Sequence, residues 1–232
     1  MSEKNFFLDG ESKEVVIREG AAPEVFPPRA VKLNGNIFAP LEFVTKRKVE
    51  IPANKTNVVF DYDKLSIELT VDEDVHFASI ITGKLEKFPD LLSFCINNPK
   101  RFSIVELFKV LRLKRAYFQT REEHARILSQ LQKLEVNTQV KFTSANDLKG
   151  NAAIQKLVEA KSNLDLSFIL NIPVYKGIAA KTFVVEIDVE PTDGTILCGL
   201  VSSDLADIEI QLRDEIMTAQ LKAFSEYVVI EK

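Results

Sequence analysis

Hydrophobic and polar side chains alternate most clearly between residues 64 and 71. Every odd position from 65 to 71 is apolar, and Ser66, Glu68 and Thr70 lie between them. A period of two is typical of a half-buried strand. Residues 58–62 (VVFDY) precede this segment and are separated from it by Asp63, so we expect the two to pair as neighbouring strands.

Two adjoining segments are also predicted to be strands. Residues 37–44 are largely apolar but are interrupted by Pro40. Residues 75–87 are ambiguous, and Thr82-Gly83 within them suggests a turn. The first part of the chain is therefore expected to be mainly β-structure.

The middle of the chain has the spacing and start signals of helices. Pro89 can open a helical first turn, and the apolar residues after it continue to the Asn-Asn-Pro at 97–99. Ser103 with Glu106, and Thr120 with Glu123, have the spacing of capping boxes, and each precedes apolar residues three or four apart. Two further helices should therefore meet near residues 118–120.

The last third alternates between the two patterns. We expect a hairpin that turns at 191–194 and, after it, a long helix. The predicted elements are a strand at 139–143, a helix at 151–162, strands at 165–174, 182–190 and 195–201, a helix at 204–224 and a strand at 227–230.

Strands, then helices, then strands is the order of an α+β fold with a mainly antiparallel sheet and packed helices. The length of 232 residues fits a single domain, which we place at residues 31–232. Residues 1–30 are predicted to be an extended N-terminal arm, with a short strand at 14–18 and a Pro-rich run at 23–29.

Cysteine content and hydropathy predict a soluble cytoplasmic protein. Cys95 and Cys198 each lie in an apolar run, which favours buried free thiols over a disulfide or a reactive thiol. The N-terminus lacks a signal-peptide pattern, and no apolar run is long enough to cross a membrane.

Charge is distributed unevenly, although the net charge is only −4. Residues 99–133 contain nine Lys or Arg against three acids, whereas residues 182–232 contain three against eleven. The basic residues gather around 109–121, next to two aromatic residues. The candidate nucleic-acid-binding residues are Lys109, Arg112, Lys114, Arg115, Tyr117, Phe118 and Arg121.

Cations that follow a phosphate backbone, beside rings that stack on bases, are the features of single-strand binding. The alternative is a solvated helix face whose Tyr117 and Phe118 belong to the core, because the protein as a whole is acidic. A second alternative is that basic and acidic surfaces pair between copies, head to tail, within a homo-oligomer.

No motif predicts catalysis or a cofactor. The eight glycines form no phosphate-binding loop, and His76 and His124 lack further ligands at metal-binding spacing, so structural or surface roles are expected for both. One metal hypothesis is left open. Glu186, Asp188 and Glu190 alternate with apolar residues and would share one strand face, where they could hold Mg²⁺ or could simply face solvent.

Two segments resemble a domain family of unknown function that tailed phages and prophages encode. They are residues 88–98 (FPDLLSFCINN), similar to the family's aromatic-rich helix ending in Asn or Asp, and residues 166–177 (LSFILNIPVYKG), similar to its apolar strand followed by Ile-Pro, an aromatic and Gly. A third place of likeness is the strand pair that follows, which ends in an Ile-rich helix. The resemblance as a whole covers about residues 30–225. The resemblance implies a phage-encoded protein of the host cytoplasm, and it brings no catalytic residues.

The sequence therefore predicts a non-enzymatic, phage-type nucleic-acid-binding protein that favours single strands. The alternative function is a self-assembling or partner-binding protein, such as a virion component or a host-directed inhibitor, that uses the basic helix and the acidic C-terminal surface. A metal-dependent enzyme built on the three carboxylates is the third hypothesis.

Overall fold

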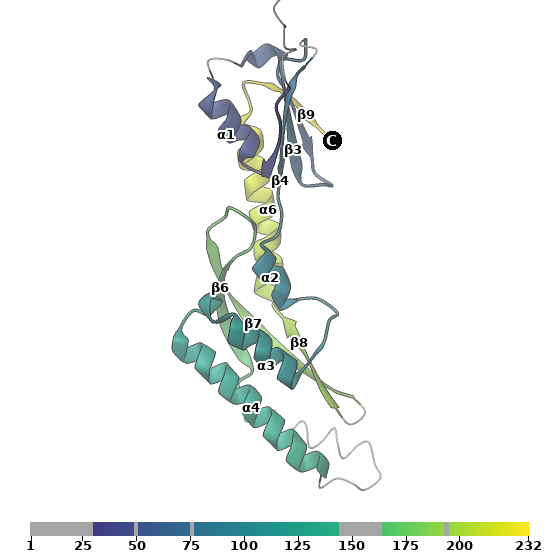
Figure 1. The fold of residues 1–232 in the computed structure, drawn as a ribbon, viewed down its shortest axis with the longest axis vertical. Coiled ribbons are helices and arrows are strands. Elements are labelled where there is room, and N and C mark those ends of the chain that lie inside the picture. Colours follow the sequence, from purple (N-terminus) through teal and green to yellow (C-terminus); the bar gives the residue numbers. More distant parts are fainter. Residues whose placement is uncertain (1–29, 49–50, 75–76, 144–163, 193–194) are drawn as a thin grey trace, which may run out of the picture.

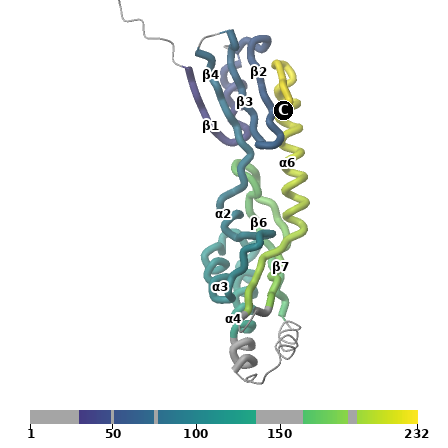
Figure 2. Tube along the Cα trace, turned by 90° about the vertical axis from the view of Figure 1, so that its right-hand side faces the viewer, coloured from purple at the N-terminus to yellow at the C-terminus, as the bar shows by residue number. Residues whose placement is uncertain are grey.

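A computed structural model describes residues 30–48, 51–74, 77–143, 164–192 and 195–232. Within them the chain forms an elongated molecule with one sheet in each half, and helix α6 (Ser203–Ala223) runs alongside both (Figures 1 and 2). We call the half that contains α1 and β9 the upper lobe, and the half that contains α3 and α4 the lower lobe. Helices and two sheets confirm the predicted α+β class.

The upper lobe has a five-stranded sheet in the order β1-β4-β3-β2-β9. The β2–β3 and β3–β4 pairs are antiparallel, whereas β1 runs parallel to β4 and β9 runs parallel to β2. The predicted alternation is confirmed, because Ile67 and Leu69 are fully buried and Glu68 between them is exposed. The elements are β1 (Lys32–Asn36), α1 (Ala39–Lys46), η2 (Ala53–Lys55), β2 (Asn57–Asp61), β3 (Ser66–Val71), β4 (Ser79–Lys84) and β9 (Val228–Glu231).

Two details of the upper lobe correct the sequence prediction. Residues 37–44 do not form a strand, because Pro40 sits in the first turn of α1, where its missing N–H is not needed. Thr82-Gly83 is not a turn but part of β4. Glycine is needed there because a Cβ on Gly83 would lie 2.6 Å from Cδ of Pro40, and the absence of a side chain lets α1 approach the strand.

The lower lobe has a four-stranded antiparallel sheet in the order β5-β8-β7-β6. The predicted hairpin is confirmed as β7 and β8, and one face of the sheet packs against α3 and α4. The elements are α2 (Pro89–Phe94), β5 (Phe102–Ser103), α3 (Ile104–Leu113), η3 (Arg115–Tyr117), α4 (Arg121–Thr143), β6 (Ser167–Pro173), β7 (Ala180–Thr192) and β8 (Thr195–Val201).

The predicted strand at 139–143 is wrong, because α4 continues to Thr143. Thr120 caps the start of this helix by accepting a hydrogen bond from the backbone N–H of Glu123 at 3.1 Å. Ile127, Leu131 and Leu134 then bury one face of it at helical spacing. The predicted arm at 1–30 (apart from Ala30), its strand at 14–18 and the helix at 151–162 lie outside the described residues.

The outer edge of β6 is covered rather than open. Ile169 donates its backbone N–H to the carboxylate of Glu123 at 2.8 Å, and its carbonyl accepts the N–H of Gln119 at 3.2 Å. Arg126 donates to the carbonyl of Ser167 at 2.5 Å. An uncovered edge strand would invite pairing with another chain, so these bonds block that route and also fix the start of α4 against the sheet.

The two lobes meet where the loop after β6 lies against residues 85–88. Phe88 donates its N–H to the carbonyl of Val174 at 2.9 Å, and the Tyr175 hydroxyl donates to the carbonyl of Glu209 on α6 at 3.1 Å. Lys87 forms an ion pair with Glu209 at 2.7 Å.

None of the described helices is both long and apolar enough to cross a membrane.

Candidate nucleic-acid interface

The candidate residues gather where α3 ends and α4 begins, which we call the α3–α4 corner and define by the exposed residues Lys109, Arg112, Leu113, Arg115 and Arg121. The capping box that starts α3 is confirmed. The Ser103 hydroxyl accepts from the N–H of Glu106 at 3.2 Å, and the Glu106 carboxylate accepts from the N–H of Ser103 at 2.9 Å.

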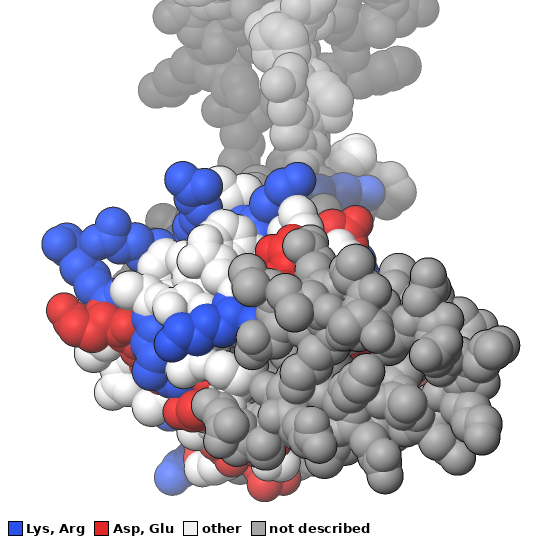
Figure 3. All heavy atoms as spheres, turned by 90° about the horizontal axis from the view of Figure 1, so that it is seen from below, with Lys and Arg blue, Asp and Glu red and all other residues white. Residues whose placement is uncertain are grey.

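The cations of the corner face solvent. Lys109 and Arg112 are three residues apart on α3 and share a face, while Arg115 and Arg121 flank the turn that follows. Arg112, Arg115 and Arg121 form no ion pair within the part of the chain that the structure describes. Seen from below, Lys and Arg side chains gather around an uncharged patch of the lower lobe (Figure 3).

Lys114 and Tyr117, both predicted to face the ligand, turn toward the protein instead. Both donate hydrogen bonds to the carboxylate of Asp90, and these bonds, with Lys114 the larger cause, hold the pKa of Asp90 below its usual range. The same bond raises the pKa of the Tyr117 hydroxyl. The ring of Tyr117 meets the edges of Phe88 and Phe94, with centroids 6.2 and 6.4 Å apart.

Phe118 is a core residue and is removed from the predicted contact surface. Only 7% of it is exposed, and its ring stacks on Phe168 with centroids 5.2 Å apart. Its other neighbour is the ring of His124 at 4.7 Å. His124 is itself buried, with Nε2 3.1 Å from the carbonyl of Leu111, so it has the structural role that the sequence suggested.

The corner holds one feature that sequence reasoning missed. Leu113 is 83% exposed, although an apolar side chain at the end of an amphipathic helix would ordinarily be expected to pack. It borders an open depression of about 540 Å³, to which Arg115 and Arg121 also contribute. The remaining lining residues are Ala116, Phe118, Gln119 and Thr120. Only the position of Leu113 between two cations could have drawn attention to it.

The three carboxylates of the metal hypothesis do share a strand face, as predicted, but a cation from the protein lies against two of them. Arg101 donates to Glu190 at 3.1 Å and lies 3.8 Å from Asp188, and its guanidinium packs over Gly199, where a Cβ would come within 2.7 Å of Nη1. Within the described residues, no three His, Cys, Asp or Glu side chains are grouped to hold a metal.

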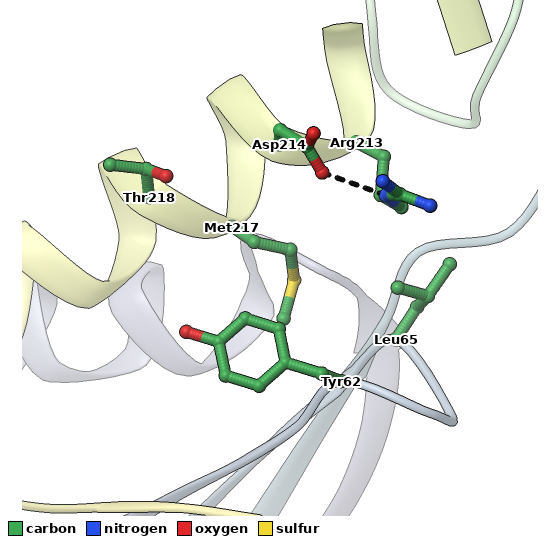
Figure 4. Close-up of a pocket in the computed structure, with 6 residues that line it drawn as sticks. All are labelled: Tyr62, Leu65, Arg213, Asp214, Met217 and Thr218. Atoms are coloured by element: carbon green, nitrogen blue, oxygen red, sulfur yellow. Dashed lines mark hydrogen bonds and ion pairs between the residues drawn. The ribbon is translucent and has the colours of Figure 1, made fainter. Parts of the chain in front are cut away.

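A second depression of about 330 Å³ lies between the β2–β3 turn and α6 (Figure 4). Three of its polar side chains are already engaged. Arg213 pairs with Asp214 at 2.8 Å, and the Tyr62 hydroxyl donates to Glu231 at 3.0 Å. Both cysteines are free, with Cys198 buried as predicted and Cys95 partly buried.

Comparisons with protein-family models, curated proteins and solved structures find no match for this chain.

Proposed function

We propose that the protein binds nucleic acid through the phosphate backbone, at the α3–α4 corner. The observation that carries this proposal is the group of exposed arginines, Arg112, Arg115 and Arg121, which have no acidic partner among the described residues of an acidic protein. Arginine is the residue best suited to paired hydrogen bonds with phosphate oxygens. The start of α4 adds the partial positive charge of a helix N-terminus.

The mode of binding differs from the one that the sequence favoured. With Phe118 buried and Tyr117 bonded to Asp90, neither predicted ring is free to stack on a base, and the recognition that we propose rests on charge. The affinities for single-stranded and duplex ligands should then differ less than they would for a surface that stacks on bases. A phage-encoded origin, which the sequence resemblance implies, remains part of the proposal.

The test is fluorescence anisotropy of labelled single-stranded and duplex oligonucleotides at several salt concentrations. If Lys109 and the three arginines each neutralise a phosphate, the slope of log K against log salt should be about −3 for a single strand. Changing Arg112, Arg115 and Arg121 together to Ala should bring the slope to about −1 and weaken binding at low salt.

A matched variant removes the same charge from the upper lobe and α6, by changing Lys32, Lys84 and Lys222 to Ala. These side chains are exposed and belong to β1, β4 and the last turn of α6, which are not elements of the corner. This variant should keep the wild-type slope. An equal loss of oligonucleotide affinity in both triple variants would show that net charge governs binding. Wild-type affinity in the triple arginine variant would exclude the corner as the binding site.

A further inference from the structure

A second surface of the lower lobe has the chemistry that complements the corner. On β7, Val185, Ile187 and Val189 are buried, so the residues between them lie on the opposite face of the sheet. Val184 on that face is 40% exposed, and Val201 on β8 is 44% exposed. The acid Glu186 is directly opposite Val201 in the strand register and is also exposed.

These residues line a groove of about 330 Å³, together with Ser202, Ser203 and Asp204 at the start of α6. Its walls are fixed by hydrogen bonds. Val184 donates its N–H to Asp204 at 3.2 Å, and the Ser202 hydroxyl donates to the carbonyl of Val184 at 2.5 Å. The first turn of α6 thus takes over from β8 as the partner of β7, and the groove between them holds two exposed valines beside the acids Glu186 and Asp204.

We infer that this groove receives the α3–α4 corner of a second copy of the chain, with Leu113 between Val184 and Val201. Leu113 is an exposed aliphatic side chain flanked by cations, and the groove is an exposed aliphatic pair flanked by Glu186 and Asp204. Asp207, exposed one turn further along α6, extends the acidic side. Opposite charges around an apolar contact would set the orientation as well as the attraction.

The contact must join two copies, because one copy cannot bend its corner into its own groove. The corner is tied to the outer edge of β6 through the Phe118–Leu170 bridge and the bond from Gln119 to Ile169. β7 and the groove lie beyond β6. Reaching across would break the covered edge of the sheet.

A contact between two different surfaces repeats head to tail, and the product is a ring or an open filament. The groove and corner are small beside a standard interface, so association should be weak and should weaken further as salt screens the charges. This inference goes beyond the proposed function and stands on the groove. Because both use the corner, nucleic acid should compete with assembly.

The test is the mass of the full chain by sedimentation velocity, over a wide concentration range and at low and high salt. We expect the wild-type mass to rise with concentration at low salt. Leu113→Asp disables only the corner and Glu186→Arg disables only the groove, so each variant alone should associate at least tenfold more weakly. An equal mixture of the two variants should form a dimer and no larger species. The intact corner of the Glu186→Arg variant would bind the intact groove of the Leu113→Asp variant, and no second intact pair would remain.

Leu92→Asp and Glu68→Arg provide controls, since they change an exposed leucine and an exposed glutamate elsewhere and should assemble like the wild type. A wild-type chain that stays monomeric in every condition, or a mixture that stays monomeric, overturns the inference. The Glu186→Arg variant separates the two proposals. If this variant binds oligonucleotide but the mixture of variants does not dimerise, only the proposed assembly contact is wrong. If the mixture dimerises but the variant binds no oligonucleotide, only the nucleic-acid proposal is wrong.

Discussion

Replacing Phe118 with Ala separates a packing role from a ligand-binding role. The ring is 7% exposed and touches both Phe168 and His124, so its removal deletes a buried side chain and an aromatic stack and leaves a cavity. Burial of a Phe side chain contributes about 1.5–3 kcal/mol and an aromatic pair about 0.5–1.5 kcal/mol. With the cavity, we expect the free energy of unfolding to fall by about 3–4 kcal/mol.

For a chain of 232 residues, such a loss lowers the melting temperature by about 10 °C. Typical domains have a margin of about 5–15 kcal/mol, so the variant should remain folded at room temperature. Urea unfolding gives the loss, and oligonucleotide anisotropy on the folded variant should give an unchanged Kd. A ring that stacked on a base would behave in the opposite way, with a stability near wild type and a loss of about 1–3 kcal/mol in binding. That result would refute the placement of Phe118 in the core.

Two further predictions concern stability. Gly83→Ala should lower the free energy of unfolding by about 1–3 kcal/mol, because its Cβ would meet Cδ of Pro40 at 2.6 Å and nearby backbone carbonyls; an unchanged melting temperature would contradict the close approach of α1 to β4. Asp90→Asn should destabilise the protein near neutral pH, because Lys114 and Tyr117 lower the pKa of Asp90 in the folded state. A lowered pKa stabilises the fold above the ordinary value of 3.8, and this contribution disappears as the pH falls through the folded-state pKa. The difference between wild-type and variant urea midpoints should therefore narrow below about pH 4, whereas a constant difference would argue against the Asp90 bonds.

Local signals in the sequence predicted the elements that local forces decide. The alternation over residues 64–71 and the capping box of Ser103 and Glu106 are both confirmed, since each depends on neighbours within a few residues. Pro40 was misread because proline interrupts a strand but also suits a helical first turn, and the residues alone do not choose between them. The choice comes from packing of α1 against β4, where Gly83 leaves room.

The division into two sheets depends on contacts that no local pattern encodes. β9 pairs with β2 from the other end of the chain, and β5 contributes a two-residue edge to β8. Helix α6 then connects the lobes and runs alongside both sheets. A period of two predicts that a strand exists but not which partner it chooses, and the α+β class could therefore be predicted while the arrangement of the strands could not.

In the candidate site, too, local sequence predicts some side-chain orientations, and distant partners decide the others. Exposure of Arg112 and Arg115 follows from their charge, because an unpaired guanidinium is costly to bury. Lys114 lies between them in the sequence and carries the same charge, yet it turns inward because Asp90, twenty-four residues earlier, supplies a carboxylate. Phe118 turns inward because Phe168 offers a ring to stack on. Both partners come from distant segments, so the sequence could group these residues but could not tell which of them face solvent and which face the core.

The separation of outward-facing cations from inward-facing residues has a physical consequence for recognition. The inward residues Lys114 and Tyr117 anchor the short turn between α3 and α4 through Asp90, and the bond from Gln119 to Ile169 ties the end of the turn to β6. Outward cations on an anchored turn keep their spacing when the ligand is absent, and less conformational entropy is then lost on binding. A fixed pattern of charge around a single exposed leucine can discriminate between ligands by shape as well as by charge. A phosphate backbone would contact only the cations of the corner, whereas the groove of a second copy would contact the cations and Leu113. The replacement of Leu113 therefore best distinguishes nucleic-acid binding from self-association.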